Sequence, residues 1–141
     1  MIRFFDTSAL AKRYVSEPGS AMVRATLRAH QVAVARVTYA ELAASVARAA
    51  RGGVITDAQR DAIFTRLEAD FAKLRVIEVR GPTLAVVPRL VTTHALRGYD
   101  AVQLAAALAL AGLGEPVEFW SADEALCRAA LAEGMRVITP R

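Results

Sequence analysis

The chain has 141 residues, of which 55% are hydrophobic and 23% are charged, and its formal net charge is +4. This composition excludes a disordered chain, which would be poor in apolar residues, and the length suits a single domain spanning residues 1–141. The longest apolar run, residues 104–113, is shorter than the roughly 20 residues of a membrane span, and Asp6 interrupts any signal-peptide core, so we expect a cytoplasmic protein with no membrane association.

Apolar runs and turn residues predict short strands that alternate with longer helices. In chain order, the predictions are a strand at 2–5, helices at 8–15 and 19–30, a strand at 32–37, helices at 38–51 and 56–74, a strand at 75–79, helices at 83–96 and 99–111, a strand at 117–120, a helix at 123–133 and a strand at 136–139. Pro88 is expected to kink or restart its helix, and Thr56-x-x-Gln59 predicts a capping box.

Strands that are continuous apolar runs, separated by helices, indicate a parallel sheet covered on both faces. The predicted fold class is therefore α/β, a three-layer sandwich with five parallel strands. Ligands on such sheets bind at the carboxyl ends of the strands, so the polar residues at those ends are the candidates for function.

The few cysteines and histidines limit the chemistry that is available. One cysteine, Cys127, excludes an internal disulfide and a cysteine-rich zinc site, and it suits a reducing compartment. His30 and His94 are too few and too far apart for a histidine-based metal site. The positive charge comes almost wholly from arginine, because Lys12 and Lys73 are the only lysines. Arginine suits contact with phosphate, although a basic surface can also serve solubility alone.

Four carboxylates follow the predicted strands or open the helices beside them. Asp6 ends the first strand, and Asp123 follows the fourth. Glu41 lies one turn into the helix after the second strand. Asp100 opens the most apolar helix, whose N-terminus can reach the same edge of the sheet. All four are therefore candidates for one site.

Each acid also has an ordinary interpretation as a helix-capping group. Thr38-x-x-Glu41 and Ser121-x-x-Glu124 both have the pattern of a capping box, with Asp123 in the first turn of the second helix. Asp6 is a candidate N-cap after the first strand. Asp100 is a candidate to complement the dipole of the helix that it opens.

The capping interpretation is weakest for Asp6 and Asp100, which adjoin apolar segments where a lone acid is costly to bury. Taken together, four carboxylates at one edge repel one another unless a cation binds. Oxygen ligands without thiolate or paired imidazole select a hard ion, Mg²⁺, with Mn²⁺ as a substitute. Such an ion on a basic protein points to phosphoryl chemistry on a nucleic acid.

The segments around these acids resemble the PIN domain family, specifically the VapC-type toxin ribonucleases of bacterial toxin–antitoxin pairs. The motifs occur in order over nearly the whole chain: Asp6-Thr7-Ser8-Ala9-Leu10, Glu17-Pro18-Gly19-Ser20, Tyr39-Ala40-Glu41-Leu42, Tyr99-Asp100-Ala101 with Leu104-Ala105-Ala106-Ala107, and Ser121-Ala122-Asp123-Glu124-Ala125-Leu126. Ser121 stands where the family usually has threonine. Serine keeps the hydroxyl, so we expect its hydrogen bond into the acidic cluster to be present.

The resemblance implies an acidic Mg²⁺ site, endonucleolytic cleavage of RNA, a homodimer, and inhibition by a cognate antitoxin whose tail covers the site. The homodimer would form a hetero-oligomer with the antitoxin. The site would consist of Asp6, Glu41, Asp100 and Asp123.

The expected mechanism is hydrolysis by metal-activated water, which would leave a 5′-phosphate and a 3′-hydroxyl if the family pattern holds. Asp6 and Asp100 would be the main Mg²⁺ ligands. Glu41 would hold the water or help to deprotonate it, and Asp123 would bind a second ion or orient the others. Ser8 and Ser121 are candidates to support the carboxylates by hydrogen bonds.

Arginines near the motifs are candidates for contact with phosphate. Arg97, just before Asp100, could reach the scissile phosphate, and Arg13, Arg36 and Arg48 are further candidates. A solvated arginine at a helix start explains Arg97 equally well.

Two other functions fit parts of the pattern. A phosphatase with Asp6 as nucleophile would have a second aspartate two residues later, where this chain has Ser8. A catalytically silent PIN-like module that binds RNA or a partner would have lost one or more of the acids, and all four are present.

Overall fold

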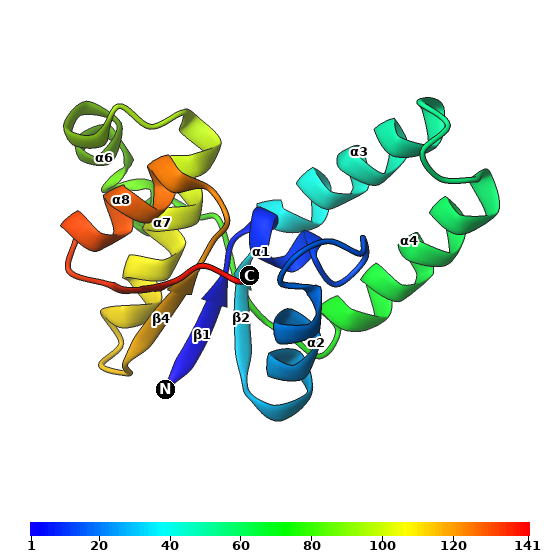
Figure 1. Cartoon of the computed structure of the whole chain (residues 1–141). Helices are drawn as coiled ribbons and strands as arrows, with labels where there is room; N and C mark the ends of the chain where they lie inside the picture. Colours follow the sequence, from blue (N-terminus) through cyan, green and yellow to red (C-terminus); the bar gives the residue numbers. More distant parts are fainter.

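The structure, a computed structural model of residues 1–141, is a parallel sheet of five strands with helices on both faces (Figure 1). The elements in chain order are β1 (Ile2–Phe5), α1 (Thr7–Ala11), α2 (Ser20–Ala29), β2 (Val32–Ala35), α3 (Val37–Arg51), α4 (Asp57–Phe71), β3 (Arg75–Ile77), α5 (Gly81–Leu84), α6 (Val87–His94), α7 (Gly98–Ala111), β4 (Val117–Trp120), α8 (Glu124–Ala132) and β5 (Arg136–Ile138). The predicted α/β three-layer sandwich is confirmed. None of these helices combines the length and the apolar character that a bilayer crossing requires.

The order of the strands is β3-β2-β1-β4-β5, so β1 lies at the centre and the chain turns to opposite sides of it. In the register, Phe5 at the end of β1 is beside Val34 of β2 and Trp120 of β4. The residues that follow these strands therefore meet at one edge. This is the switch point at which open α/β sheets bind ligands.

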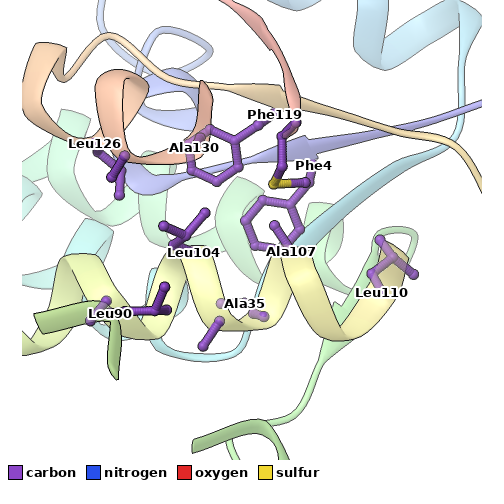
Figure 2. Close-up of a cluster of buried hydrophobic side chains, with 14 of the residues drawn as sticks. Phe4, Ala35, Leu90, Leu104, Ala107, Leu110, Phe119, Leu126 and Ala130 are labelled. Atoms are coloured by element: carbon purple, nitrogen blue, oxygen red, sulfur yellow. The ribbon is translucent and has the colours of Figure 1, made fainter. Parts of the chain in front are cut away.

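The core has two parts, one on each face of the sheet, because successive strand residues point to opposite sides. On one face Phe4 stacks on Phe119, with ring centroids 5.7 Å apart, against the apolar surface of α7. Figure 2 shows these two rings close to Leu104 and Ala107 of α7. On the other face the aromatic residues next in sequence, Phe5 and Trp120, stack at 4.9 Å and pack against α1 to α4.

A new helix begins one residue before Pro88, where the sequence predicts a kink or a restart. One predicted helix at 83–96 is in fact two, α5 and α6, and Pro88 lies in the first turn of α6, where a missing N–H costs nothing. The capping box at the start of α4 is confirmed: Gln59 N–H donates to Thr56 Oγ1 at 3.0 Å, and Thr56 N–H donates to Gln59 Oε1 at 2.8 Å.

Several predicted boundaries are too long. The helix predicted at 8–15 ends at Ala11 and continues as turns, and the strands predicted at 32–37 and 75–79 end at Ala35 and Ile77. The early end of β2 matters for function, because α3 then begins at Val37 and brings Glu41 back towards the edge of the sheet.

Candidate metal and phosphate site

Asp6 is buried at the end of β1, where it caps α1 and accepts hydrogen bonds from two serines. It is 3% exposed. Its Oδ1 accepts from Ala9 N–H at 2.8 Å and from Ser8 Oγ at 2.7 Å, and its Oδ2 accepts from Ser121 Oγ at 2.6 Å. Burial outweighs these hydrogen bonds and raises the pKa of Asp6 to about 6, with a small contribution from the charge of Asp123. Asp6 therefore caps α1 and is at the same time a candidate residue of the site.

Ser8 and Ser121 connect α1 to the loop between β4 and α8. Ser8 Oγ accepts from Ala122 N–H at 2.8 Å, and Ser121 Oγ accepts from Asp123 N–H at 3.0 Å. The hydrogen bond expected from Ser121 into the acidic cluster is present, and its acceptor is Asp6. These contacts hold two of the acids in a defined relation to each other.

Glu41 is held by a polar network that the sequence analysis missed. Its Oε1 accepts from Thr7 Oγ1 at 2.7 Å and from Gln103 Nε2 at 2.9 Å. Gln103, 2% exposed, also donates to Thr38 Oγ1 at 2.8 Å. A glutamine three residues after Asp100, inside an apolar helix, was the signal that could have identified it.

This network shows that the capping-box interpretation of Glu41 is wrong. α3 begins at Val37, so Thr38 lies inside the helix rather than at its cap. Arg36 is the N-cap and makes no side-chain capping hydrogen bond. Glu41 Oε2 makes no hydrogen bond within the protein, so one oxygen of this carboxylate stays available.

Asp123 is the N-cap of α8, and its Oδ1 accepts from Leu126 N–H at 2.9 Å. The capping interpretation is thus correct for Asp123, although the predicted box that begins at Ser121 does not form. Asp100 lies in the first turn of α7. Burial raises the pKa of Asp100, and the negative charges of Asp123 and Glu41 raise it further, while Arg97 lowers it. Asp123 and Glu41 are therefore close enough to influence the ionisation of Asp100.

The acids meet at a cavity of about 450 Å³ whose lining includes Glu41, Asp100, Asp123, Arg97 and Tyr99. Asp6 is buried and is not part of this lining. No three acidic, histidine or cysteine side chains stand close enough together to hold a metal ion between them. The donors are all carboxylate oxygens, and burial and mutual repulsion raise the pKa of Asp6 and Asp100, a cost that a cation would relieve. The chemistry of these residues therefore fits a hard cation. For several of the carboxylates to bind one ion, their side chains have to move closer together.

The structure brings one of the two leading candidate arginines to this cavity. Arg97 is the N-cap residue of α7 and forms no ion pair and no side-chain hydrogen bond. Arg13 instead donates from Nε and Nη2 to the carboxylate of Asp70, at 2.5 and 3.0 Å, and lines a different cavity. Arg36 is paired with Glu78, whereas Arg48 is exposed and has no partner.

Comparison with known proteins agrees with this geometry. The family model described as "PIN domain" matches residues 3–137. Ribonuclease VapC45 and Ribonuclease VapC49, both of Mycobacterium tuberculosis, are 36% identical to this chain over 140 residues, covering 95% of it and 92% of each relative.

Solved structures with the same fold include VapBC2 from Rickettsia felis bound to a promoter DNA fragment, with a TM-score of 0.70 and 12% identity, covering 99% of this chain and 98% of that one. FitAcB from Neisseria gonorrhoeae has a TM-score of 0.69 and 21% identity, with the same coverage. The order of the strands, the acids at the switch point and the match over nearly its whole length show that this chain belongs to the PIN domain family.

Proposed function

We propose that the chain, as one PIN domain over residues 1–141, is a Mg²⁺-dependent endoribonuclease and the toxin of a VapBC-like toxin–antitoxin pair, with Mn²⁺ as a substitute ion. The observation that carries the proposal is the convergence of Glu41, Asp100 and Asp123 on one cavity, with buried Asp6 linked to Asp123 through the hydroxyl of Ser121. The ribonuclease names of the two relatives at 36% identity support the same activity.

Asp6 and Asp100 are the proposed main ligands of Mg²⁺, with Asp123 as a further ligand or an orienting group. When bound, the ion supplies positive charge that stabilises the phosphate in the transition state and favours ionisation of the attacking water. Glu41 has its Oε1 held by Thr7 and Gln103, so its Oε2 is the atom that accepts the proton of the attacking water.

The phosphate is held by Arg97 and by the start of α7. The N-cap of α7 makes no side-chain hydrogen bond, so the first N–H groups of this 14-residue helix are free, whereas the starts of α1 and α8 are capped by Asp6 and Asp123. Free N–H groups at a helix start attract phosphate oxygens. Arg97 adds a full positive charge at the same place.

The proposed partners are RNA as substrate, a cognate antitoxin that covers the acidic site, and a second copy of this chain. The antitoxin is proposed because the similar solved structures include toxin–antitoxin complexes, among them one from Klebsiella pneumoniae at 18% identity. Co-expression with the neighbouring gene's product, followed by light scattering of the purified complex, tests both the antitoxin and the homodimer. A chain that stays monomeric and binds no neighbouring product would contradict the toxin assignment.

RNA cleavage with Mg²⁺ tests the activity directly. The variants Asp6→Ala and Asp100→Asn should lose cleavage, and a chelator should abolish cleavage by the wild type. Glu68→Gln, which removes an exposed carboxylate of α4, is the matched control and should cleave normally. If the two site variants cut RNA as well as the control does, the assignment fails. Binding of RNA without any cleavage would instead indicate a silent PIN-like module.

A further inference from the structure

A second groove adjoins the acidic cavity and shares two of its lining residues. Its volume is about 420 Å³, and its lining includes Ala40, Glu41, Ala44, Ser45, Arg48 and Tyr99. Glu41 and Tyr99 line the acidic cavity as well. The two hollows therefore adjoin at these residues, and together they are called the channel below.

One wall of the second groove is an open stretch of α3. Ala40, Ala44 and Ser45 are small and exposed, so nothing of the chain fills the space above them. Arg48 lies at the far end, seven residues after Glu41, which corresponds to about 10 Å along a helix. Its guanidinium is exposed and forms no ion pair and no side-chain hydrogen bond. The groove thus leads from a carboxylate to a free positive charge.

Tyr99 stands between the two hollows with its ring uncovered. Its side chain is the most exposed of the tyrosines at 66%, and it makes no aromatic pair and no hydrogen bond. Tyr39 differs, because its ring packs edge-on against Phe71 with centroids 5.2 Å apart. An exposed aromatic ring beside a cationic groove provides a surface on which an unpaired base can stack.

The charges of the channel favour a phosphate-bearing strand over a peptide. The carboxylates at its centre repel a phosphate unless cations lie nearby, and unpaired arginines stand at both ends, Arg97 in the acidic cavity and Arg48 in the groove. With the scissile phosphate held at the acids by Arg97, the guanidinium of Arg48 in the groove is placed for a neighbouring phosphate of the same strand. A double helix would hide its bases from Tyr99, so the strand is single.

We propose that this groove is a subsite for the nucleotide next to the scissile phosphate of single-stranded RNA. The base of that nucleotide stacks on the ring of Tyr99, and a phosphate of the strand pairs with Arg48. The subsite rests on the proposed ribonuclease function and adds to it where the flanking nucleotide binds and which residues hold it.

The first experiment compares variants on a random-sequence single-stranded RNA pool, whose cleavage sites are read by sequencing, and then on an oligonucleotide made from the preferred site. Tyr99→Ala should raise KM roughly 5- to 150-fold, the range for loss of one stacked base, with a small change in kcat, and Tyr99→Phe should restore the wild-type KM. Arg48→Gln should also raise KM and should lower the salt slope of binding by about 0.7. Arg51→Gln, on the same helix outside the groove, is the matched control.

The second experiment places an abasic nucleotide at each position beside the cut. In the wild type one position should raise KM, and in Tyr99→Ala the same abasic nucleotide should have no further effect, because the ring and the base form one contact. If the abasic effect and the Tyr99→Ala effect add independently, or if both groove variants behave as Arg51→Gln does, the subsite is wrong while the ribonuclease stands. Loss of antitoxin binding alone would assign the groove to that protein and overturn the proposal. A wild type that neither binds nor cuts the pool would refute the ribonuclease itself.

Discussion

The amide of Gln103 holds the carboxylate of Glu41: Nε2 lies 2.9 Å from Oε1, and this bond links α7 to α3 across the start of the site. The same nitrogen donates to the hydroxyls of Thr38 and Thr7. Gln103 Oε1 is buried and has no hydrogen-bond partner. The two hydrogens of this amide are shared among three acceptors, so Gln103 helps to fix Oε1 of Glu41, whereas Oε2 of Glu41 makes no hydrogen bond within the protein.

Gln103→Leu should therefore reduce catalysis more than RNA binding. Loss of a hydrogen bond that orients a metal-site carboxylate typically costs about 10- to 100-fold in activity or metal affinity. We expect kcat to fall within that range and the Mg²⁺ concentration for half-maximal rate to rise, with KM for RNA nearly unchanged. Gln103→Glu, of the same shape, should be worse because it places a second carboxylate beside Glu41. Equal activity of all three proteins would show that Glu41 needs no such support.

Asp6 makes the metal-free protein less stable as the pH rises. Because the pKa of Asp6 is about 6 in the fold against 3.8 as its ordinary value, the folded state keeps its proton longer than the unfolded state. The contribution is full below pH 4 and is lost as pH rises through 6, a change of roughly 3 kcal/mol for two pKa units. The raised pKa of Asp100 acts in the same direction.

Urea denaturation in the presence of a chelator, at pH 5 and pH 7.5, measures the upper half of this loss, about 1.4 kcal/mol, because the rest is already lost below pH 5. Asp6→Asn cannot ionise and should show a much smaller difference between the two pH values. Glu133, whose pKa is lowered to about 2 by Arg89 and His94, should not interfere, because its effect on stability lies below pH 4.5. A slope that is unchanged in Asp6→Asn would mean that another group is responsible.

Mg²⁺ should raise the melting temperature of the wild type, because an ion that binds only the folded state stabilises it by about 2.7 kcal/mol at 100 times its dissociation constant. Asp100→Asn should be more stable than the wild type without metal, since it removes a half-buried charge that Asp123 and Glu41 repel. The same variant should respond less to Mg²⁺. Scanning calorimetry with and without Mg²⁺ checks both effects, and Na⁺ at equal ionic strength is the control. An identical Mg²⁺ response in both proteins would exclude Asp100 as a ligand.

Substitution of Arg13 should affect stability, and substitution of Arg97 should affect substrate binding. Arg13 and Tyr14 both donate to Asp70, and the Arg13–Asp70 pair is largely shielded from solvent. Arg13→Gln should therefore cost about 1 to 3 kcal/mol of unfolding free energy and leave KM for RNA unchanged. Arg97→Gln should raise KM and leave the stability nearly unchanged. The opposite pattern in denaturation and cleavage assays would reverse the two assignments.

The identity and order of the main elements could be predicted from the sequence because their determinants are local. The apolar run at Ile2–Phe5, the turn residues between segments and the Thr56–Gln59 box each act over a few residues. The acids after β1 and β4 could be placed at one edge for the same reason, since parallel strands end together. The ends of the elements are less local. The strand predicted to reach residue 37 ends at Ala35 as β2, because α3 begins at Val37.

Length, composition and strand pattern thus determined by themselves that this is an α/β chain with a cluster of carboxylates at the switch point. Only the tertiary structure decided which partner each polar group has. No pattern near Arg13 predicts its contact with Asp70, which is 57 residues away in the sequence. In the same way, no pattern near Glu41 predicts its contact with Gln103, 62 residues away. A hydrogen bond or ion pair depends on distances of a few ångströms between side chains, and those are set when the helices pack on the sheet.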